Sequence, residues 1–267
     1  MIERNNISTF RGARRIWAVG AIHGEAARLA ALHAAMAPRL AFGDRLVYLG
    51  NYLGVGPALY DTIAELLRFR RIFLSIPPYM DCADVVFLRG AQEEMWQKLL
   101  QLQFSAHPAE VLEWMLAHGA DATLTAYGGD AADGFNSAAQ GAMALTAWTN
   151  ELRAMARAAP GHDALMSALK DAALSHDHGV LFVNTGLDAE RPLSAQTDSF
   201  WWAGRSFAAI TDRYEGFQRI VRGFDPDHGG YFETTATLTI DGGCGFGGRL
   251  IAVCLSPEGA ILDRLDV

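Results

Sequence analysis

The sequence has few cysteines, few positive charges and no long apolar run. Its three cysteines, Cys82, Cys244 and Cys254, lie far apart without a Cys-x-x-Cys pair, which argues against a disulfide framework or a zinc ribbon and favours a cytoplasmic location. Lys and Arg number 22 against 30 Asp and Glu, so we expect no nucleic-acid partner. No apolar run reaches membrane-spanning length, and we expect no membrane association.

The apolar content is sufficient for one large core. With 267 residues, 51% of them hydrophobic, the chain is expected to form a single domain over residues 1–267, with a flexible tail at residues 1–12 and no signal peptide. Predicted strands at 15–19, 45–49 and 84–88 are each followed by a loop and a helix. Three such units in succession predict a largely parallel, buried sheet.

The second half of the chain is different in pattern. Residues 105–178 are predicted to form a helical insert that carries Trp114 and Trp148, with a mobile loop at 127–136. The strands that we expect after it alternate apolar and polar residues, which is typical of an antiparallel second sheet. Their ranges are 179–183, 219–222, 231–233, 236–240, 250–255 and 261–265.

The loops that follow the strands carry the functional signal, because ligands of open α/β proteins bind at the carboxyl ends of strands. The first of these loops holds His23 without an acid beside it. The loop sequences, in chain order, are Gly20-Ala21-Ile22-His23-Gly24, Gly50-Asn51-Tyr52-Leu53-Gly54-Val55-Gly56, Gly90-Ala91-Gln92-Glu93, Asn184-Thr185-Gly186 and Gly223-Phe224.

In order and spacing, these loops resemble the signature blocks of the calcineurin-like metallophosphoesterases, over nearly the whole chain. The resemblance is strongest to the branch of serine/threonine phosphoprotein phosphatases and symmetrical diadenosine tetraphosphatases. It implies an α/β fold, a four-layer αββα sandwich of two mixed sheets. It also implies a two-metal centre, in which manganese, iron or zinc ions about 3.5 to 4 Å apart clamp a phosphoryl group.

The residues that the chemistry of that family needs are mostly replaced here. Of the six metal-ligand positions only His23 keeps its identity; the others are Ala21, Asn51, Ala91, Asn184 and Phe224. The protonating histidine is replaced by Gln92, its orienting acid by Gly54 and a phosphate-binding arginine by Val55. We therefore expect no metal cofactor of the family type, and no intact catalytic residue.

The leading hypothesis is a catalytically inactive homologue, a pseudophosphatase that binds a protein partner or a phosphorylated ligand. The helical insert, with Trp114 and Trp148, is the expected recognition surface. The oligomeric state stays open. Glu93 and Glu94 are interpreted as residues in the first turn of a helix, where their negative charges interact favourably with the helix dipole.

Two other hypotheses stay open. One is an active phosphoesterase with a rebuilt single-metal site around His23, Asp225, Asp227 and His228, or near His176-Asp177-His178. The other is a metal-free sensor that holds a phosphate or nucleotide between Arg89, Arg205 and Arg222, since arginine binds phosphate bidentately.

Overall fold

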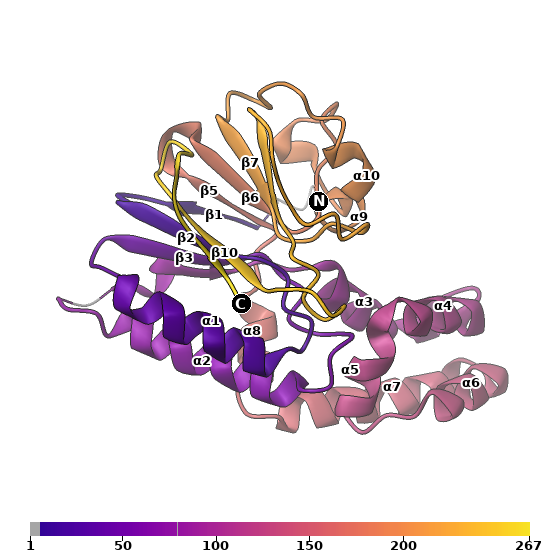
Figure 1. Cartoon of the computed structure of the whole chain (residues 1–267). Helices are drawn as coiled ribbons and strands as arrows, with labels where there is room; N and C mark the ends of the chain where they lie inside the picture. Colours follow the sequence, from indigo (N-terminus) through magenta and orange to yellow (C-terminus); the bar gives the residue numbers. More distant parts are fainter. Residues whose placement is uncertain (1–5, 79) are drawn as a thin grey trace.

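Two mixed β-sheets lie face to face in the computed structural model, with helices on their outer faces (Figure 1). The structure describes residues 6–78 and 80–267, apart from the side chain of Asp177. The predicted αββα sandwich is therefore confirmed. Of the predicted tail, residues 1–5 lie outside the described part of the chain, but Ile7–Phe10 form a strand, β1, rather than a flexible segment.

The first sheet contains the three predicted strand–loop–helix units. Its described strands have the order β11-β10-β2-β3-β4. Strands β2 (Arg15–Val19), β3 (Asp44–Tyr48) and β4 (Val85–Phe87) run parallel, and helices α1 (Ala26–Met36) and α2 (Leu59–Leu74) follow the first two. The last two strands, β10 (Ile251–Leu255) and β11 (Ile261–Asp266), join this sheet antiparallel. Their predicted place in the second sheet is wrong, because β10 is buried along its whole length between β2 and β11.

The second sheet has the order β1-β5-β6-β7-β9-β8 in the described residues. Its further strands are β5 (Ala172–Ser175), β6 (Val180–Val183), β7 (Arg219–Arg222), β8 (Tyr231–Glu233) and β9 (Thr237–Ile240). The prediction of antiparallel pairing is wrong for β6, β7 and β9, which run parallel. Parallel neighbours need a long crossover, and α9 (Ser199–Trp202) and α10 (Gly204–Phe207) lie on the one between β6 and β7.

Three apolar clusters hold the layers together. Side chains such as Val47 and Phe182 fill the space between the two sheets. Another cluster, with Phe200 and Phe207, lies under α9 and α10. The third joins the outer face of the first sheet to α1 and α2 and continues into the helical segment, where Trp148 is buried.

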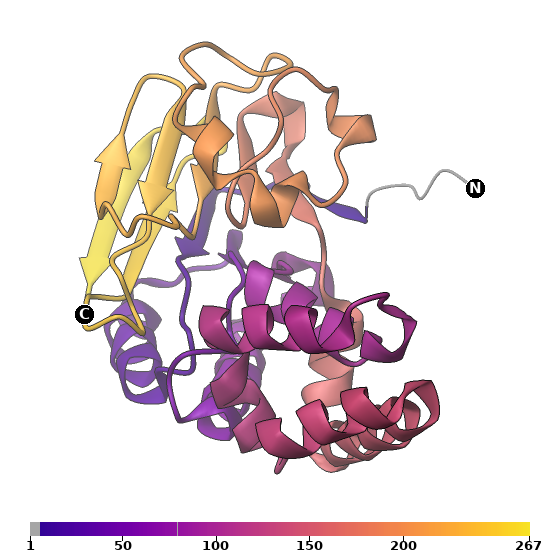
Figure 2. The ribbon, with the colours of Figure 1, turned by 90° about the vertical axis from the view of Figure 1, so that its right-hand side faces the viewer.

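The helical segment forms one group beside the sheets (Figure 2). Its helices are α3 (Ala91–Leu99), α4 (Pro108–Met115), α5 (Asp121–Ala126), α6 (Ala131–Gln140), α7 (Ala142–Ala158) and α8 (His162–Ala168). A π-helical turn at Leu116–Ala120 separates α4 from α5. The mobile loop predicted at 127–136 is wrong from residue 131 onward, because Asp130 caps α6 by accepting the N–H of Ala132 at 2.6 Å.

Short 3₁₀ turns complete the described elements at Ala37–Arg39, Cys82–Asp84, Leu102–Phe104, His176–His178 and Leu193–Ala195. Within residues 6–78 and 80–267, none of the helices combines the length and the apolar character that a membrane crossing requires.

Candidate functional site

The five predicted loops meet at one place, where strands of both sheets end. The N–H of Ala21 donates to the carbonyl of Gly223 at 2.9 Å, and the N–H of His23 donates to the carbonyl of Asn51 at 2.7 Å. From the second sheet, Asn184 accepts the N–H of Ala91 through its side-chain oxygen at 3.1 Å. The structure therefore brings together in one centre the loops whose sequences carry the resemblance.

The backbone of these loops is strained. His23, Asn51 and Val55 have φ angles of 52°, 56° and 56°, in the left-handed region that disfavours side chains, and His228 nearby has a φ of 49°. Such residues each cost on the order of 1 to 3 kcal/mol and persist only where surrounding contacts enforce them. The centre is thus a region in which packing and hydrogen bonds overrule local preference.

The side chain of Glu93 holds much of this strained backbone in place. Its buried carboxylate accepts four backbone N–H groups, from Asn51 and Gly90 at 2.8 Å, from Tyr52 at 2.8 Å and from Leu53 at 3.0 Å. Burial raises the pKa of Glu93, and the four donors act in the opposite direction. The position of Glu93 in the first turn of a helix was predicted correctly, but this role was not. The available signal was the spacing from Gly90 to Glu93, at which a glutamate in the third helical position accepts the backbone N–H of the N-cap residue.

His23 lies in an aromatic cluster at the centre. Its ring is 5.3 Å from the ring of Phe224 and 5.2 Å from that of Phe246, and the ring of His228 is 4.0 Å from Phe246. Burial lowers the pKa of His23 to about 3, with His228 acting in the same direction. Nδ1 of His23 has no hydrogen-bond partner among the described residues, while Nε2 is 3.4 Å from the amide nitrogen of Asn51. The imidazole is therefore neutral and enclosed.

A cavity of about 570 Å³ opens beside this cluster, which we call the aromatic pocket. Its wall contains no Asp, Glu, Lys or Arg among the described residues. Trp114, Trp202 and Phe246 lie at its rim with 46%, 44% and 49% of their surface exposed, and the two tryptophan rings are 6.0 Å apart. The full set of lining residues is Val55, Ala91, Gln92, Met95, Trp114, Leu116, Ala117, His118, Gly119, Thr185, Trp201, Trp202, Phe224, Pro226, His228 and Phe246.

Solved structures of phosphatases share this fold. A putative diadenosine tetraphosphatase is 19% identical, with a TM-score of 0.62 and 98% of each chain covered. A cold-active protein tyrosine phosphatase is 11% identical (TM-score 0.55, 99% of this chain and 82% of the other). A protein serine/threonine phosphatase from Saccharomyces cerevisiae is 13% identical (TM-score 0.50, 94% and 77%). The chain has the calcineurin-like metallophosphoesterase fold. No protein-family model matches the sequence, and no curated protein does.

The residues at the metal positions of the metallophosphoesterase fold do not fit a dinuclear centre. Ala21, Ala91 and Phe224 carry no donor atom. The amide of Asn184 is used within the protein, since its nitrogen donates to the carbonyl of Leu49 at 2.6 Å and its oxygen accepts the N–H of Ala91. Two adjacent divalent cations need anionic ligands between them, and the bridging position holds the neutral Asn51.

The acid–base positions of the fold are occupied by groups without useful proton chemistry. The amide nitrogen of Gln92 donates to the carbonyl of His118 at 2.8 Å. Its oxygen fills the space beside Gly54, where an added Cβ would lie 2.2 Å away, so no acid fits there without moving Gln92. A side-chain amide cannot act as a general acid or base near neutral pH, and the side chain of Val55 has no group that binds phosphate.

The groups considered for a rebuilt metal site point to other partners. Nδ1 of His228 lies 3.0 Å from a carboxylate oxygen of Asp241, and Asp225 pairs with Arg222 at 2.9 Å. The His176–His178 turn precedes β6, at the end of that strand opposite to the centre. Within the described part of the chain, no group of three or more His, Cys, Asp and Glu side chains is placed to hold a metal ion.

The three arginines considered for an anion site lie apart. Arg89 pairs with Glu94 at 3.0 Å and lines a cavity beside α3 that neither of the other two lines. Arg222 is buried and donates to Thr239 and to the carbonyl of Gly204, and burial lowers its pKa while Asp225 acts in the opposite direction. Arg205 is exposed on α10. The structure therefore does not assemble this trio around one ligand.

Proposed function

We propose that this chain is a pseudophosphatase, a catalytically inactive metallophosphatase homologue that binds an apolar group of a protein partner in its aromatic pocket. The observation that carries the proposal is the exchange of a metal-binding centre for an uncharged, aromatic one. Phosphoryl groups are held in proteins by cations and N–H donors, and neither Arg nor Lys lines the aromatic pocket in the described residues. An apolar occupant fits this wall better than a phosphorylated one.

The rim favours a protein as the source of that group. Trp114, Trp202 and Phe246 are large apolar side chains that stand about half exposed around one opening. Aromatic residues are enriched at protein interfaces, where a few of them carry most of the binding free energy. The partner we expect therefore presents an aromatic or aliphatic side chain that enters the cavity, with contacts to the tryptophans around it.

Metal content and phosphatase activity test the catalytic half of the proposal. The purified chain is incubated with manganese, freed of excess metal, analysed by elemental mass spectrometry, and assayed with p-nitrophenyl phosphate and diadenosine tetraphosphate. We expect no stoichiometric metal and no turnover above the blank. Bound metal together with turnover that His228→Ala abolishes would overturn the proposal in favour of a rebuilt phosphoesterase.

Binding of a side-chain mimic tests the other half. We expect N-acetyltryptophan amide to bind saturably by calorimetry, and Trp202→Ala to weaken this binding about tenfold, because an aromatic contact contributes roughly 1 kcal/mol beyond its buried area. Phe42→Ala is the matched control, since the exposure of Phe42 (49%) is close to that of Trp202 (44%) but Phe42 does not line the pocket. Equal effects of the two substitutions would contradict an interface at this rim.

A further inference from the structure

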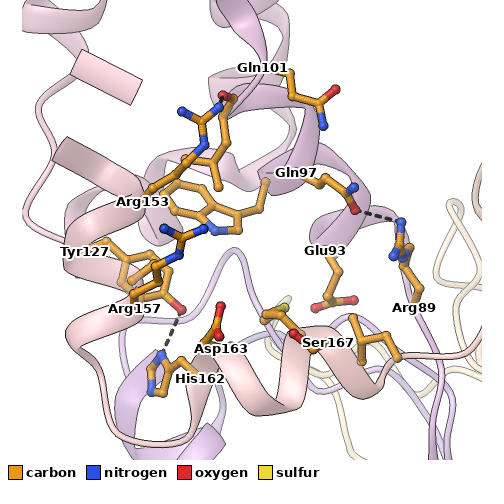
Figure 3. Close-up of a pocket in the computed structure, with 15 residues that line it drawn as sticks. Arg89, Glu93, Gln97, Gln101, Tyr127, Arg153, Arg157, His162, Asp163 and Ser167 are labelled. Carbon is orange, nitrogen blue, oxygen red and sulfur yellow. Dashed lines mark hydrogen bonds between the residues drawn. The ribbon is translucent and has the colours of Figure 1, made fainter. Parts of the chain in front are cut away.

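A second cavity, of about 330 Å³, lies on the other side of α3, between α3, α7 and α8 (Figure 3). We call it the arginine pocket. In contrast to the aromatic pocket, its wall carries guanidinium, amide and hydroxyl groups. They belong to Arg89, Arg153, Arg157, Gln97, Gln101 and Ser167.

Arg153 and Arg157 extend from α7 toward this space (Figure 3). Residues four apart on a helix share a face, so the spacing places both guanidinium groups on the same wall. Across from them, Gln97 and Gln101 have the same spacing along α3 and the turn that follows it. The arrangement surrounds a small volume with N–H donors from two sides.

The charge of the two α7 arginines is not neutralised by the acceptors that hold them. Arg153 donates to the side-chain oxygen of Asn150 and to the carbonyl of Leu100, and both acceptors are neutral. Arg157 makes no hydrogen bond or ion pair within the described residues. Arg153 is partly buried and Arg157 is exposed, so both guanidinium groups remain available to a ligand in the cavity.

The other charged groups of the wall either have partners of their own or form no ion pair with the α7 arginines. Arg89 is paired with Glu94 at 3.0 Å and bonded to Gln97 at 2.7 Å. The carboxylate of Glu93 accepts hydrogen bonds from four backbone N–H groups. Asp163, exposed on α8, is the remaining lining carboxylate of the described residues, and no ion pair of 4.0 Å or less joins it to either α7 arginine. Two cations therefore face one anion, with room for a ligand between them.

We infer that the arginine pocket binds a small phosphate monoester. Arginine forks match the oxygens of a phosphate bidentately, and a dianion matches two uncompensated guanidinium groups. The amides of Gln97 and Gln101 and the hydroxyl of Ser167 offer hydrogen bonds to the organic part. This site is separate from the aromatic pocket and does not depend on the function proposed for it.

Titration calorimetry with phenyl phosphate tests the inference, with inorganic phosphate, benzoate and phenol as comparison ligands. We expect saturable binding of one phenyl phosphate per chain that weakens as salt is added, weaker binding of benzoate and none of phenol. Inorganic phosphate binding as tightly as phenyl phosphate would place the recognition in the phosphate group alone and still support the site. Benzoate binding more tightly than phenyl phosphate would overturn the phosphate assignment.

Two substitutions with opposite expected effects on the affinity for phenyl phosphate test whether it binds in this pocket. Arg157→Gln should weaken phenyl phosphate binding at least tenfold, and Asp163→Asn should strengthen it, because the first removes an attractive charge and the second a repulsive one. Neither changes a hydrogen bond described above, so both variants should keep the thermal unfolding profile of the wild type. Arg213→Gln, an exposed arginine outside the cavity, is the control and should change nothing. Wild-type affinity in Arg157→Gln, or no saturable binding of any anion, would overturn the inference.

Discussion

Replacing the carboxylate of Glu93 by an amide should destabilise the fold more than any neighbouring change of the same kind. One carboxylate oxygen accepts the N–H groups of Asn51 and Gly90, and the other accepts those of Tyr52 and Leu53. In Glu93→Gln one oxygen remains and serves one pair of donors. The new NH₂ group faces the other pair, so two buried backbone donors lose their acceptor.

The expected loss follows from these contacts. A hydrogen bond to a charged group contributes about 1.5 to 3 kcal/mol, so two lost bonds amount to roughly 3 to 6 kcal/mol. The neutral amide is easier to bury than the carboxylate, which offsets part of this. We expect the free energy of unfolding to fall by about 3 to 4 kcal/mol, a large share of the stability of an ordinary domain.

Glu94 provides the matched control, since it is the next residue on the same helix turn. Its carboxylate contacts Arg89 at 3.0 Å and Lys98 at 3.6 Å, and the oxygen of Gln at this position can still accept from Arg89. Glu94→Gln should therefore lower the unfolding free energy by only about 1 kcal/mol. Urea denaturation followed by circular dichroism measures both variants. Equal losses would refute the idea that Glu93 holds the loops of the centre.

Two further predictions concern single residues. Gly54→Ala should lower the unfolding free energy by about 1 to 2 kcal/mol from its φ of 78° alone, and further because the added Cβ would collide with the side chain of Gln92. Gly216→Ala, with a φ of 85° and open space around it, should show only the first effect. Equal losses from urea denaturation would contradict the collision. Burial lowers the pKa of His33 to about 4, so the unfolded state takes up the proton first and stability falls as the pH drops from about 6.5 toward 4. Between pH 6.5 and 5 the free energy of unfolding of the wild type should fall by about 1 kcal/mol per pH unit more than that of His33→Phe. Parallel curves for wild type and variant would count against this role of His33.

The sequence predicted the parts of the fold that depend on local pattern. Apolar runs with a glycine close behind them placed β2, β3 and β4 and their loops. A parallel strand buried on both faces is a nearly continuous apolar run, and glycine marks the turn that follows it. The same pattern could not assign strands to sheets. The apolar pattern of β10 is equally compatible with pairing to β2 or to β9. Only the packing of the whole chain decides between the two.

Misjudged segments have similar causes. Ile7–Phe10 is too short to give a clear strand pattern in the sequence. It is ordered by its pairing with β5, in which Ile7 lies beside Ala172, 165 residues further along the chain. In the candidate centre, the resemblance to the metallophosphoesterase signature blocks predicted which loops would meet. It could not predict that Phe246, from the turn after β9, would enclose His23, because that contact joins segments far apart in the chain.

Helix α3 is a partition shared by the two cavities. Ala91, Gln92 and Met95 face the aromatic pocket, while Trp96 and Gln97 face the arginine pocket. A ligand that shifts or stiffens this helix from one side changes the free energy of binding on the other, and the coupling must be the same in both directions. We expect the affinity for N-acetyltryptophan amide to differ between phosphate-free protein and protein saturated with phenyl phosphate. Identical affinities would mean that α3 is a rigid wall, and a measured difference would make this short helix the element that couples the aromatic pocket to an anion bound in the arginine pocket.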